Sequence, residues 1–237
     1  NTVKALFWQA TPGSYQIRAD FAEKYLGTTD PAALQDMLDT WDEVFAVAQK
    51  VNEASKGMVK LLPGYQDMQY VFANGARKEG WYDANDVITI DPAMLQYMDL
   101  AKQFYEADVT FNAGIWGTDW AALKDGDGET TPAAMMFMGC PWYSYWCLTD
   151  TWVGNTILIK GPQDFYWGGT GLAATVGCAD KELAKTILYN CTCDQDFMVE
   201  IYKANNDFLN NKAAIQYIID NGVAGTSSFR LFGDQNA

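Results

Sequence analysis

Hydrophobic and polar residues follow two different periods along this chain, and together they predict helices that alternate with short strands. Apolar residues recur at helical spacing from Trp41 through Val44 to Val51. Short apolar runs predict strands at residues 87–90 and 172–176 and, for the sheet, at residues 3–9, 58–62, 134–138 and 155–160. The predicted fold class is therefore α/β, with many helices and one small mixed sheet built from these last four strands.

Several predicted helices begin at recognisable capping residues. Asp30 and Asp91 each precede a proline, the preferred arrangement of a capping residue and a first helical residue. Thr40 and Glu43 have the spacing of a capping box. Further helices are predicted at residues 15–26, 65–72, 180–189, 194–203 and 207–219.

Large apolar residues on these helices are candidates for the core. Trp41 lies on the apolar face of its predicted helix, and Trp81 and Trp120 are assigned to the core with it. In the helix that follows Asp91, Leu95 and Met98 are expected to face inward.

The segment from Gly139 to Gly169 is dense in aromatic residues and is repeatedly broken by glycine and proline. Its rings belong to Trp142, Tyr143, Tyr145, Trp146, Trp152, Tyr166 and Trp167. The breaks place these rings at turns and at the ends of elements. Aromatic rings fill a core, or they stack on a flat apolar partner such as the C–H face of a sugar. Both alternatives stay open for this segment alone.

The net charge restricts the partners of the chain. A formal charge of −14 argues against nucleic acids and anionic membrane surfaces as partners, because both require basic patches. It suits a neutral or cationic ligand, although solubility alone is the favoured explanation. No apolar run approaches the ~20 residues of a membrane span, and no secretory signal peptide opens the sequence. Because the chain begins directly with a predicted strand, we expect a mature or excised piece.

The residue types available for chemistry are limited. Histidine is absent, which excludes Ser-His-Asp and Cys-His catalysis in their usual forms and metal sites that use histidine. The five cysteines include no C-x-x-C pair, and buried free thiols are the favoured interpretation. Acidic residues alternate from Asp125 to Glu129, but Thr130 stands where a calcium loop needs glycine. We expect a solvated turn there, and no metal, cofactor or enzymatic activity.

Several stretches, taken in order, resemble the extracellular solute-binding proteins of carbohydrate ABC transporters, the maltose-binding-protein-like family 1. They are Trp-Gln-Ala-Thr-Pro-Gly-Ser-Tyr at residues 8–15, Thr-Trp-Asp-Glu at 40–43, the strand and Pro-Trp turn at 134–142, Tyr-Trp-Gly-Gly at 166–169 and Lys-Glu-Leu-Ala at 181–184. The resemblance implies a helix-rich lobe of the periplasmic-binding-protein type II kind. It also implies non-catalytic binding of a sugar or oligosaccharide for uptake, with the ligand stacked on aromatic rings in a cleft between two lobes.

The same resemblance implies a domain organisation. Members of the family are longer, so the chain resembles a fragment that lacks most of the first lobe and the C-terminal helices. Residues 1–164 and 204–237 resemble the second lobe, and residues 165–203 resemble an excursion that completes the first. The implied partners are a saccharide and the membrane permease subunits of the transporter. The implied state is a monomer, extracellular as a cell-surface lipoprotein or periplasmic.

Family positions for ligand contact fall on particular residues of this chain. Trp142, after the proline of the strand-end turn, and Trp167, on the glycine-rich return, are expected to stack on the sugar. Tyr143, next to Trp142, joins them. Trp116 lies in a loop that either reaches the cleft or packs elsewhere. Asp67 is expected to accept hydrogen bonds from sugar hydroxyls or to cap a helix.

Three more candidates flank the first predicted turn. Trp8 and Tyr15 lie on either side of it, and Arg18 offers a forked donor for ligand hydroxyls or for Asp20. The alternative function is an adhesion or interaction domain that uses its aromatic surface for a protein partner. A concave ring-lined cleft favours sugar binding, whereas a flat exposed patch favours the interface. A glycosidase is disfavoured because no pair of carboxylates is marked by spacing.

Overall fold

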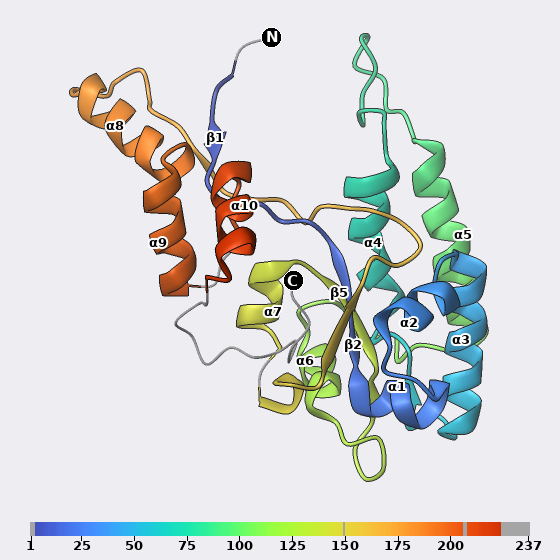
Figure 1. The fold of residues 1–237 in the computed structure, drawn as a ribbon. Coiled ribbons are helices and arrows are strands. Elements are labelled where there is room, and N and C mark those ends of the chain that lie inside the picture. The colour runs from blue at the N-terminus through green and yellow to red at the C-terminus, as the bar shows by residue number, and fades with distance from the viewer. Residues whose placement is uncertain (1–2, 149, 206–207, 224–237) are drawn as a thin grey trace. The chain divides into compact units, whose positions relative to one another are not determined.

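The computed structural model describes residues 3–148, 150–205 and 208–223, which form two compact units (Figure 1). The described part of unit 1 consists of residues 3–11 and 168–223, and that of unit 2 of residues 12–167, with the gaps just given. Residues 224–237, which the sequence assigns to the second lobe, lie outside the described residues. No described helix is both long and apolar enough to cross a membrane.

Unit 2 is built on a three-stranded antiparallel sheet in the order β5-β2-β6. The strands are β2 (Ser14–Arg18), β5 (Met136–Gly139) and β6 (Thr156–Ile159). The prediction of a helix over residues 15–26 is wrong in its first part, because α1 (Ala19–Leu26) begins only after β2. Four of the five residues of β2 are buried. Tyr15 and Ile17 alternate with polar residues, which is a strand pattern, but both faces of this central strand are covered, so Gln16 and Arg18 are buried as well.

The expected single mixed sheet is also wrong, although the α/β class is confirmed. Strand β3 (Val59–Lys60) pairs in parallel with β4 (Ala133–Ala134) in a separate two-stranded sheet. In unit 1, β1 (Leu6–Phe7) pairs antiparallel with β7 (Gly171–Leu172). The four apolar runs expected to form the sheet do mark strands, but these strands belong to three small sheets. Residues 87–90 contain an isolated bridge at Ile88, and the run at 172–176 overlaps β7 only at Leu172.

Helices cover the sheet of unit 2, and their predicted caps are confirmed. After α1, the α-helices in the described part of this unit are α2 (Pro31–Met37), α3 (Trp41–Ala54), α4 (Met68–Val71), α5 (Pro92–Glu106), α6 (Thr118–Asp125) and α7 (Pro141–Trp146). The Asp30 carboxylate accepts from backbone N–H groups of α2. The Thr40 hydroxyl accepts from the Glu43 N–H at 3.2 Å and donates to the Glu43 carboxylate at 2.8 Å.

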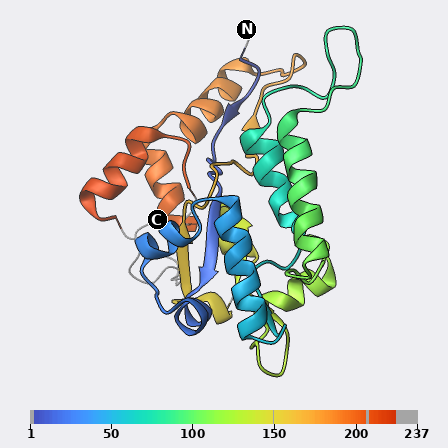
Figure 2. The ribbon, with the colours of Figure 1, turned by 90° about the vertical axis from the view of Figure 1, so that its right-hand side faces the viewer.

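Short helical turns complete unit 2. They are η1 (Tyr65–Asp67), the π-helical turn η2 (Phe72–Ala76) and η3 (Asp150–Trp152). Figure 2 shows α3 alongside α5, where the Phe45 and Phe104 rings lie 5.2 Å apart.

The apolar core of unit 2 confirms some predicted positions and corrects others. Trp41 and Trp120 are buried, and the Trp41 ring lies 5.1 Å from that of Phe72. Trp81 is instead 47% exposed, with the Arg77 guanidinium 4.6 Å over its ring.

The structure also tests three predictions about individual side chains, on helix α5, on the cysteines and on the acidic turn. Leu95 and Met98 are exposed, because α5 turns Met94, Leu100 and Phe104 to the core instead. All five cysteines are free, but only Cys140 is buried. The expected solvated turn is confirmed, since the Asp127 carboxylate accepts hydrogen bonds from N–H groups of the following residues.

Unit 1 holds the other described helices. They are α8 (Lys181–Thr192), α9 (Gln195–Asn205) and α10 (Lys212–Asn221). Asp180 caps α8 and Asp194 accepts from the first turn of α9, as predicted. A small core cluster is formed by Met198, Val199, Leu209 and Ala214.

Replacing Trp41 by Ala should destabilise unit 2 by about 3–5 kcal/mol, because it removes a buried ring from the α3 face. Urea unfolding followed by far-UV circular dichroism measures this loss. Trp81→Ala is the matched control and should cost well under 1 kcal/mol of unfolding free energy, since about half of that side chain is exposed. Equal losses for the two variants would contradict this description of the core.

Candidate functional site

Unit 2 brings together five aromatic rings from four separate segments, and we call them the aromatic cluster. They are Tyr70 of α4, Trp116 of the loop before α6, Trp142 and Tyr143 of α7, and Trp167 at the end of the unit. Four of the five were predicted as ligand contacts from the sequence. Trp142 and Trp167 are half-buried, and Trp116 is 48% exposed.

The three indoles of the cluster contact one another directly. Trp116 and Trp142 are nearly parallel, with centroids 6.3 Å apart and 15° between their planes. Trp167 lies 6.1 Å from each of them at 85°. A sugar between two parallel rings needs about 3.5–4.0 Å on each side. The gap between Trp116 and Trp142 is too narrow for that, so a stacked ligand has the outer ring faces available.

The backbone of Trp116 is held in an unusual conformation. Its φ is +68°, in the left-handed region that costs a non-glycine residue of order 1–3 kcal/mol. The loop is fixed on both sides of it. The Ile115 N–H donates to the Gln66 side-chain oxygen at 3.2 Å, and the Gly117 N–H donates to the Gly114 carbonyl at 2.8 Å. Strain that the surrounding structure holds in place is typical of a functional position.

The end of strand β5 sets the start of α7 and so positions Trp142 and Tyr143 in the cluster. It ends at Gly139, and Pro141 then starts α7. A Cβ atom on Gly139 would lie 2.3 Å from the Tyr143 ring, so only glycine lets the ring pack against the strand end. Trp142 is thereby left partly accessible while Tyr143 is buried beneath it.

Two polar groups lie in the buried part of this region. The Asp67 carboxylate accepts a hydrogen bond from the Trp120 Nε1–H, at 3.0 Å to one oxygen and 3.3 Å to the other. Burial raises the pKa of Asp67 to about 7. The Tyr143 hydroxyl is buried and has no hydrogen-bond partner among the described residues. Burial, followed by the charge on Asp67, raises the pKa of Tyr143 well above its usual value.

Asp67 was expected either to contact ligand or to cap a helix. Its side chain makes no capping hydrogen bond to α4. An anionic form of this carboxylate would be poorly solvated, because the Trp120 indole N–H and the backbone N–H of Asp67 are its described donors and no described cation pairs with it.

The remaining candidates lie elsewhere. Tyr15 is fully buried in β2 and its hydroxyl donates to the Gln163 carbonyl at 3.2 Å. The buried Arg18 guanidinium forms a forked ion pair with Asp20, which is the structural alternative considered from the sequence. Trp8 is half-buried in unit 1. The structure therefore does not bring Tyr15 or Arg18 into the aromatic cluster.

Tyr70 was not among the residues predicted from the sequence to contact ligand, and Trp120 was predicted only as a core residue. The Tyr70 ring stacks on Trp167 with centroids 4.3 Å apart and 18° between the planes. Tyr70 follows Asp67 by three residues in a predicted helix, a spacing that places both on one face and so carried a usable signal. Trp120 was predicted to be core, and it is, but its hydrogen bond to Asp67 depends on tertiary packing that no sequence pattern records.

The buried Asp67 carboxyl predicts a pH dependence of stability. Its folded pKa of about 7 lies above the ordinary value of 3.8, so the folded state keeps a proton that the unfolded chain has lost between these values. The contribution of Asp67 to unfolding free energy should therefore fall as pH rises from about 4 to about 7, by a few kcal/mol at most.

Asp67→Asn should remove this fall, and urea unfolding of both proteins across the window measures the difference. The Asn variant should be the more stable of the two above about pH 7, where the parent must bury a charge. Parallel pH profiles for the parent and the variant would show that Asp67 does not titrate in this window.

Comparison with known proteins gives structural matches only. No protein-family model and no curated protein matches the sequence. A solved structure described as an extracellular solute-binding protein of family 1 matches with a TM-score of 0.75 at 13% identity, over 91% of this chain and 55% of that one.

The descriptions of two further matched structures each name a source organism and a saccharide. An ABC-transporter-associated binding protein from B. animalis subsp. lactis Bl-04, solved with β-1,6-galactobiose, has a TM-score of 0.66 at 16% identity, over 98% of this chain and 59% of that one. A putative oligosaccharide periplasmic-binding protein from Synechococcus sp. MITs9220 has a TM-score of 0.62 at 14% identity, over 95% and 56%. The chain thus spans less than two thirds of the length of each structure. What the comparisons establish is the fold: over that length, this chain is similar to extracellular solute-binding proteins.

Proposed function

We propose that this chain binds a saccharide on its aromatic cluster and carries out no reaction on it. The observation that carries the proposal is the meeting of three partly exposed indoles, Trp116, Trp142 and Trp167, from three separate segments. Sugar rings present flat C–H faces that stack on indoles. A surface for stacking needs no nucleophile or metal, which suits a sequence without histidine.

The rings of the cluster differ in how firmly they are held. Tyr70 stacks behind Trp167, and the Asn74 side chain donates to the Trp167 carbonyl at 3.4 Å. Trp116 has a strained loop backbone. Its side chain is 48% exposed, whereas those of Trp142 and Trp167 are half-buried. In our proposal Trp167 is backed by Tyr70, and the fixed loop holds Trp116 as the most accessible ring for the ligand.

Polar groups near the rings supply the hydrogen bonds that a sugar requires. We assign Asp67 and Tyr143 to ligand hydroxyls that reach below the ring surface, because both have hydrogen-bonding capacity that the protein leaves unused. Tyr15 and Arg18 have internal partners, and we assign them a structural role in β2. Trp8 stays a predicted ligand contact.

The matched structures support a saccharide ligand and a role in uptake. Their descriptions include a complex with β-1,6-galactobiose and one with maltose. We propose that the longer protein is an extracellular or periplasmic component of an ABC transporter, anchored as a lipoprotein where it faces the cell surface. Its further partners are then the permease subunits, and a monomer is sufficient for delivery.

The domain assignment follows the same proposal. We assign residues 1–164 and 204–237 to a second lobe and residues 165–203 to an excursion into the first, with the ligand held in the cleft between lobes. Closure of two lobes around a ligand is a common hinge motion. In that arrangement Trp116, Trp142 and Tyr143 belong to the second lobe and Trp167 to the excursion, so the cluster supplies only part of the cleft and the present chain alone should bind weakly.

Trp142→Ala should weaken saccharide binding by about 1–3 kcal/mol, or roughly 5- to 150-fold, because it removes one stacking face. Intrinsic fluorescence titrations with β-1,6-galactobiose and with maltose measure the affinity, since a covered indole changes its emission. Trp81→Ala is the matched control for losing one tryptophan outside the cluster, and its affinity should equal that of the parent.

The same titrations separate binding from folding. Urea unfolding should show a smaller loss of stability for Trp142→Ala than for Trp41→Ala, because Trp142 is only half-buried. If Trp142→Ala unfolds as readily as Trp41→Ala while its folded fraction binds sugar normally, the cluster is packing and the proposed site is wrong. Self-association of the parent that Trp142→Ala abolishes would favour the protein-interaction alternative.

A further inference from the structure

Residues 107–117 connect α5 to α6 and carry Trp116, and we call them the Trp116 loop. Three residues of this loop other than glycine have a positive φ: Asp108 at +52°, Asn112 at +56° and Trp116 at +68°. Aspartate and asparagine adopt the left-handed conformation comparatively easily, whereas a bulky residue rarely does. Trp116 is therefore the strained position of the loop.

A buried lysine anchors the first half of the Trp116 loop. Lys60, the last residue of β3, has a side chain that is only 8% exposed. Its ammonium group donates to the Asp108 carbonyl and carboxylate, both at 2.8 Å, and to the Thr110 carbonyl at 3.1 Å. A buried cation with three acceptors is costly to separate from them. The start of the loop is thus fixed to β3.

The middle of the loop lies along the segment that follows β3. Leu62 forms a parallel bridge with Thr110, and the Ala113 N–H donates to the Pro63 carbonyl at 3.1 Å. A Cβ atom on Gly64 would overlap the Ala113 carbonyl oxygen, so this close approach of two backbones requires glycine. Backbone contacts therefore hold the loop to within three residues of Trp116.

The last attachment comes from the turn η1. The Gln66 side-chain oxygen accepts from the N–H of Ile115, the residue directly before Trp116, at 3.2 Å. The next residue of the turn, Asp67, accepts from the Trp120 indole, whose ring lies 5.2 Å from that of Trp116. The same turn thus holds both the backbone that leads into Trp116 and a ring that packs against it.

We propose that Gln66 is a positioning residue for saccharide binding, which holds Trp116 in its strained conformation with the outer face of the indole presented to the sugar. Without this hydrogen bond, the Trp116 backbone relaxes toward ordinary φ values, and only part of the population keeps the ring in place. A ligand that binds that part alone has its affinity reduced by the same fraction. Lys60 still anchors the far end of the loop, so the change stays close to Trp116. The inference rests on the proposed saccharide binding.

Gln66→Leu tests the role of the hydrogen bond, because it removes the acceptor with little change in side-chain size. Fluorescence titrations with β-1,6-galactobiose and with maltose should show binding about 5- to 10-fold weaker than in the parent, the effect of losing roughly one hydrogen bond. Gln66→Glu keeps an acceptor oxygen and should bind within about twofold of the parent. Gln35→Leu is the matched control, since the Gln35 side chain accepts from the Gly161 N–H at 2.8 Å, outside the cluster, and its affinity should be unchanged.

Two further measurements distinguish positioning from general stabilisation. When Gln66→Leu is combined with Trp116→Ala, affinity should fall no further than in Trp116→Ala alone, because Gln66 acts through that ring. Acrylamide quenching in the absence of sugar gives the second measurement. The part of the quenching that belongs to Trp116 is the difference between proteins with and without this residue, and it should increase in Gln66→Leu. A lower unfolding free energy by itself would change neither result.

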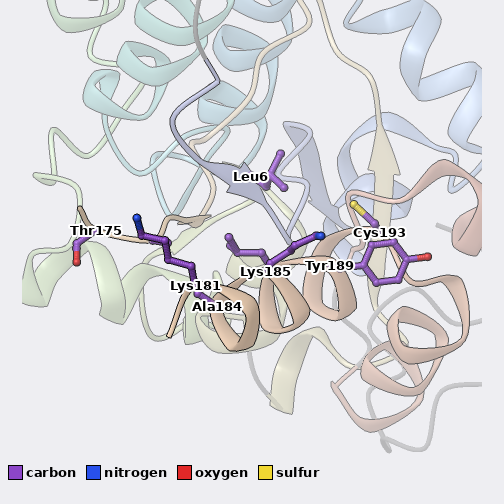
Figure 3. Close-up of a pocket in the computed structure, with 9 residues that line it drawn as sticks. Leu6, Thr175, Lys181, Ala184, Lys185, Tyr189 and Cys193 are labelled. Atoms are coloured by element: carbon purple, nitrogen blue, oxygen red, sulfur yellow. The ribbon is translucent and has the colours of Figure 1, made fainter. Parts of the chain in front are cut away.

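A cavity elsewhere provides the control for the place of binding. An open cavity of about 510 Å³ lies beside α8 in unit 1, with Leu6, Ala184 and Leu188 among its lining residues (Figure 3). No ring of the aromatic cluster lines it, and its walls are almost wholly apolar. Ala184→Arg, which fills this cavity, should therefore leave the affinity for either sugar unchanged.

The outcomes separate this inference from the proposed function. Parent-like affinity in Gln66→Leu, additive losses in the double variant, no rescue by Gln66→Glu, or unchanged quenching of Trp116 would overturn the inference and leave saccharide binding intact. Loss of binding in Ala184→Arg, or no binding of either sugar by the parent, would overturn the proposed site and this inference with it.

Discussion

The hydrogen bonding of β2 on both of its edges is the constraint on which the rest of unit 2 depends. Tyr15 lies opposite Met138 on one side and Ile159 on the other, so this short strand sets the register of β5 and β6 together. The end of β5 fixes where Gly139 falls, and the proline that follows starts α7 there. A slip of one residue would turn every side chain of β5 to the opposite face. The position of the aromatic cluster is therefore determined by backbone pairing in the sheet.

The buried polar groups in and beside the aromatic cluster impose a second constraint. Asp67 and Tyr143 place a carboxyl and a hydroxyl among aromatic rings. The Tyr143 hydroxyl has no partner among the described residues, which costs on the order of 1–3 kcal/mol. A core that served packing alone would gain from apolar residues at both positions. Retaining two polar groups beside a strained Trp116 is easier to understand if the region meets a polar ligand.

Local signals predicted the helices well and the sheet poorly. Capping residues such as Asp30, Thr40 and Asp180 act within a few residues of the helix start, so they could be read directly. The strand at residues 14–18 was assigned to a helix although Tyr15 and Ile17 alternate with polar residues, and the burial of Gln16 and Arg18 depends on partners more than a hundred residues away. Four of the five cluster rings were named from their segments, yet their grouping required the tertiary fold.

The two units differ most in how much apolar surface each buries by itself. The core of unit 2 includes residues from all three strands of its main sheet and from the helices that cover it, so its sheet is enclosed. The core of unit 1 contains four buried residues from α9, α10 and the segment between them, and α8 and β1 add none. A unit with a core this small rarely offsets the entropy of ordering its chain. The exposure of Leu183 and Ile187 on α8 is thus a consequence of a core that does not extend to that helix.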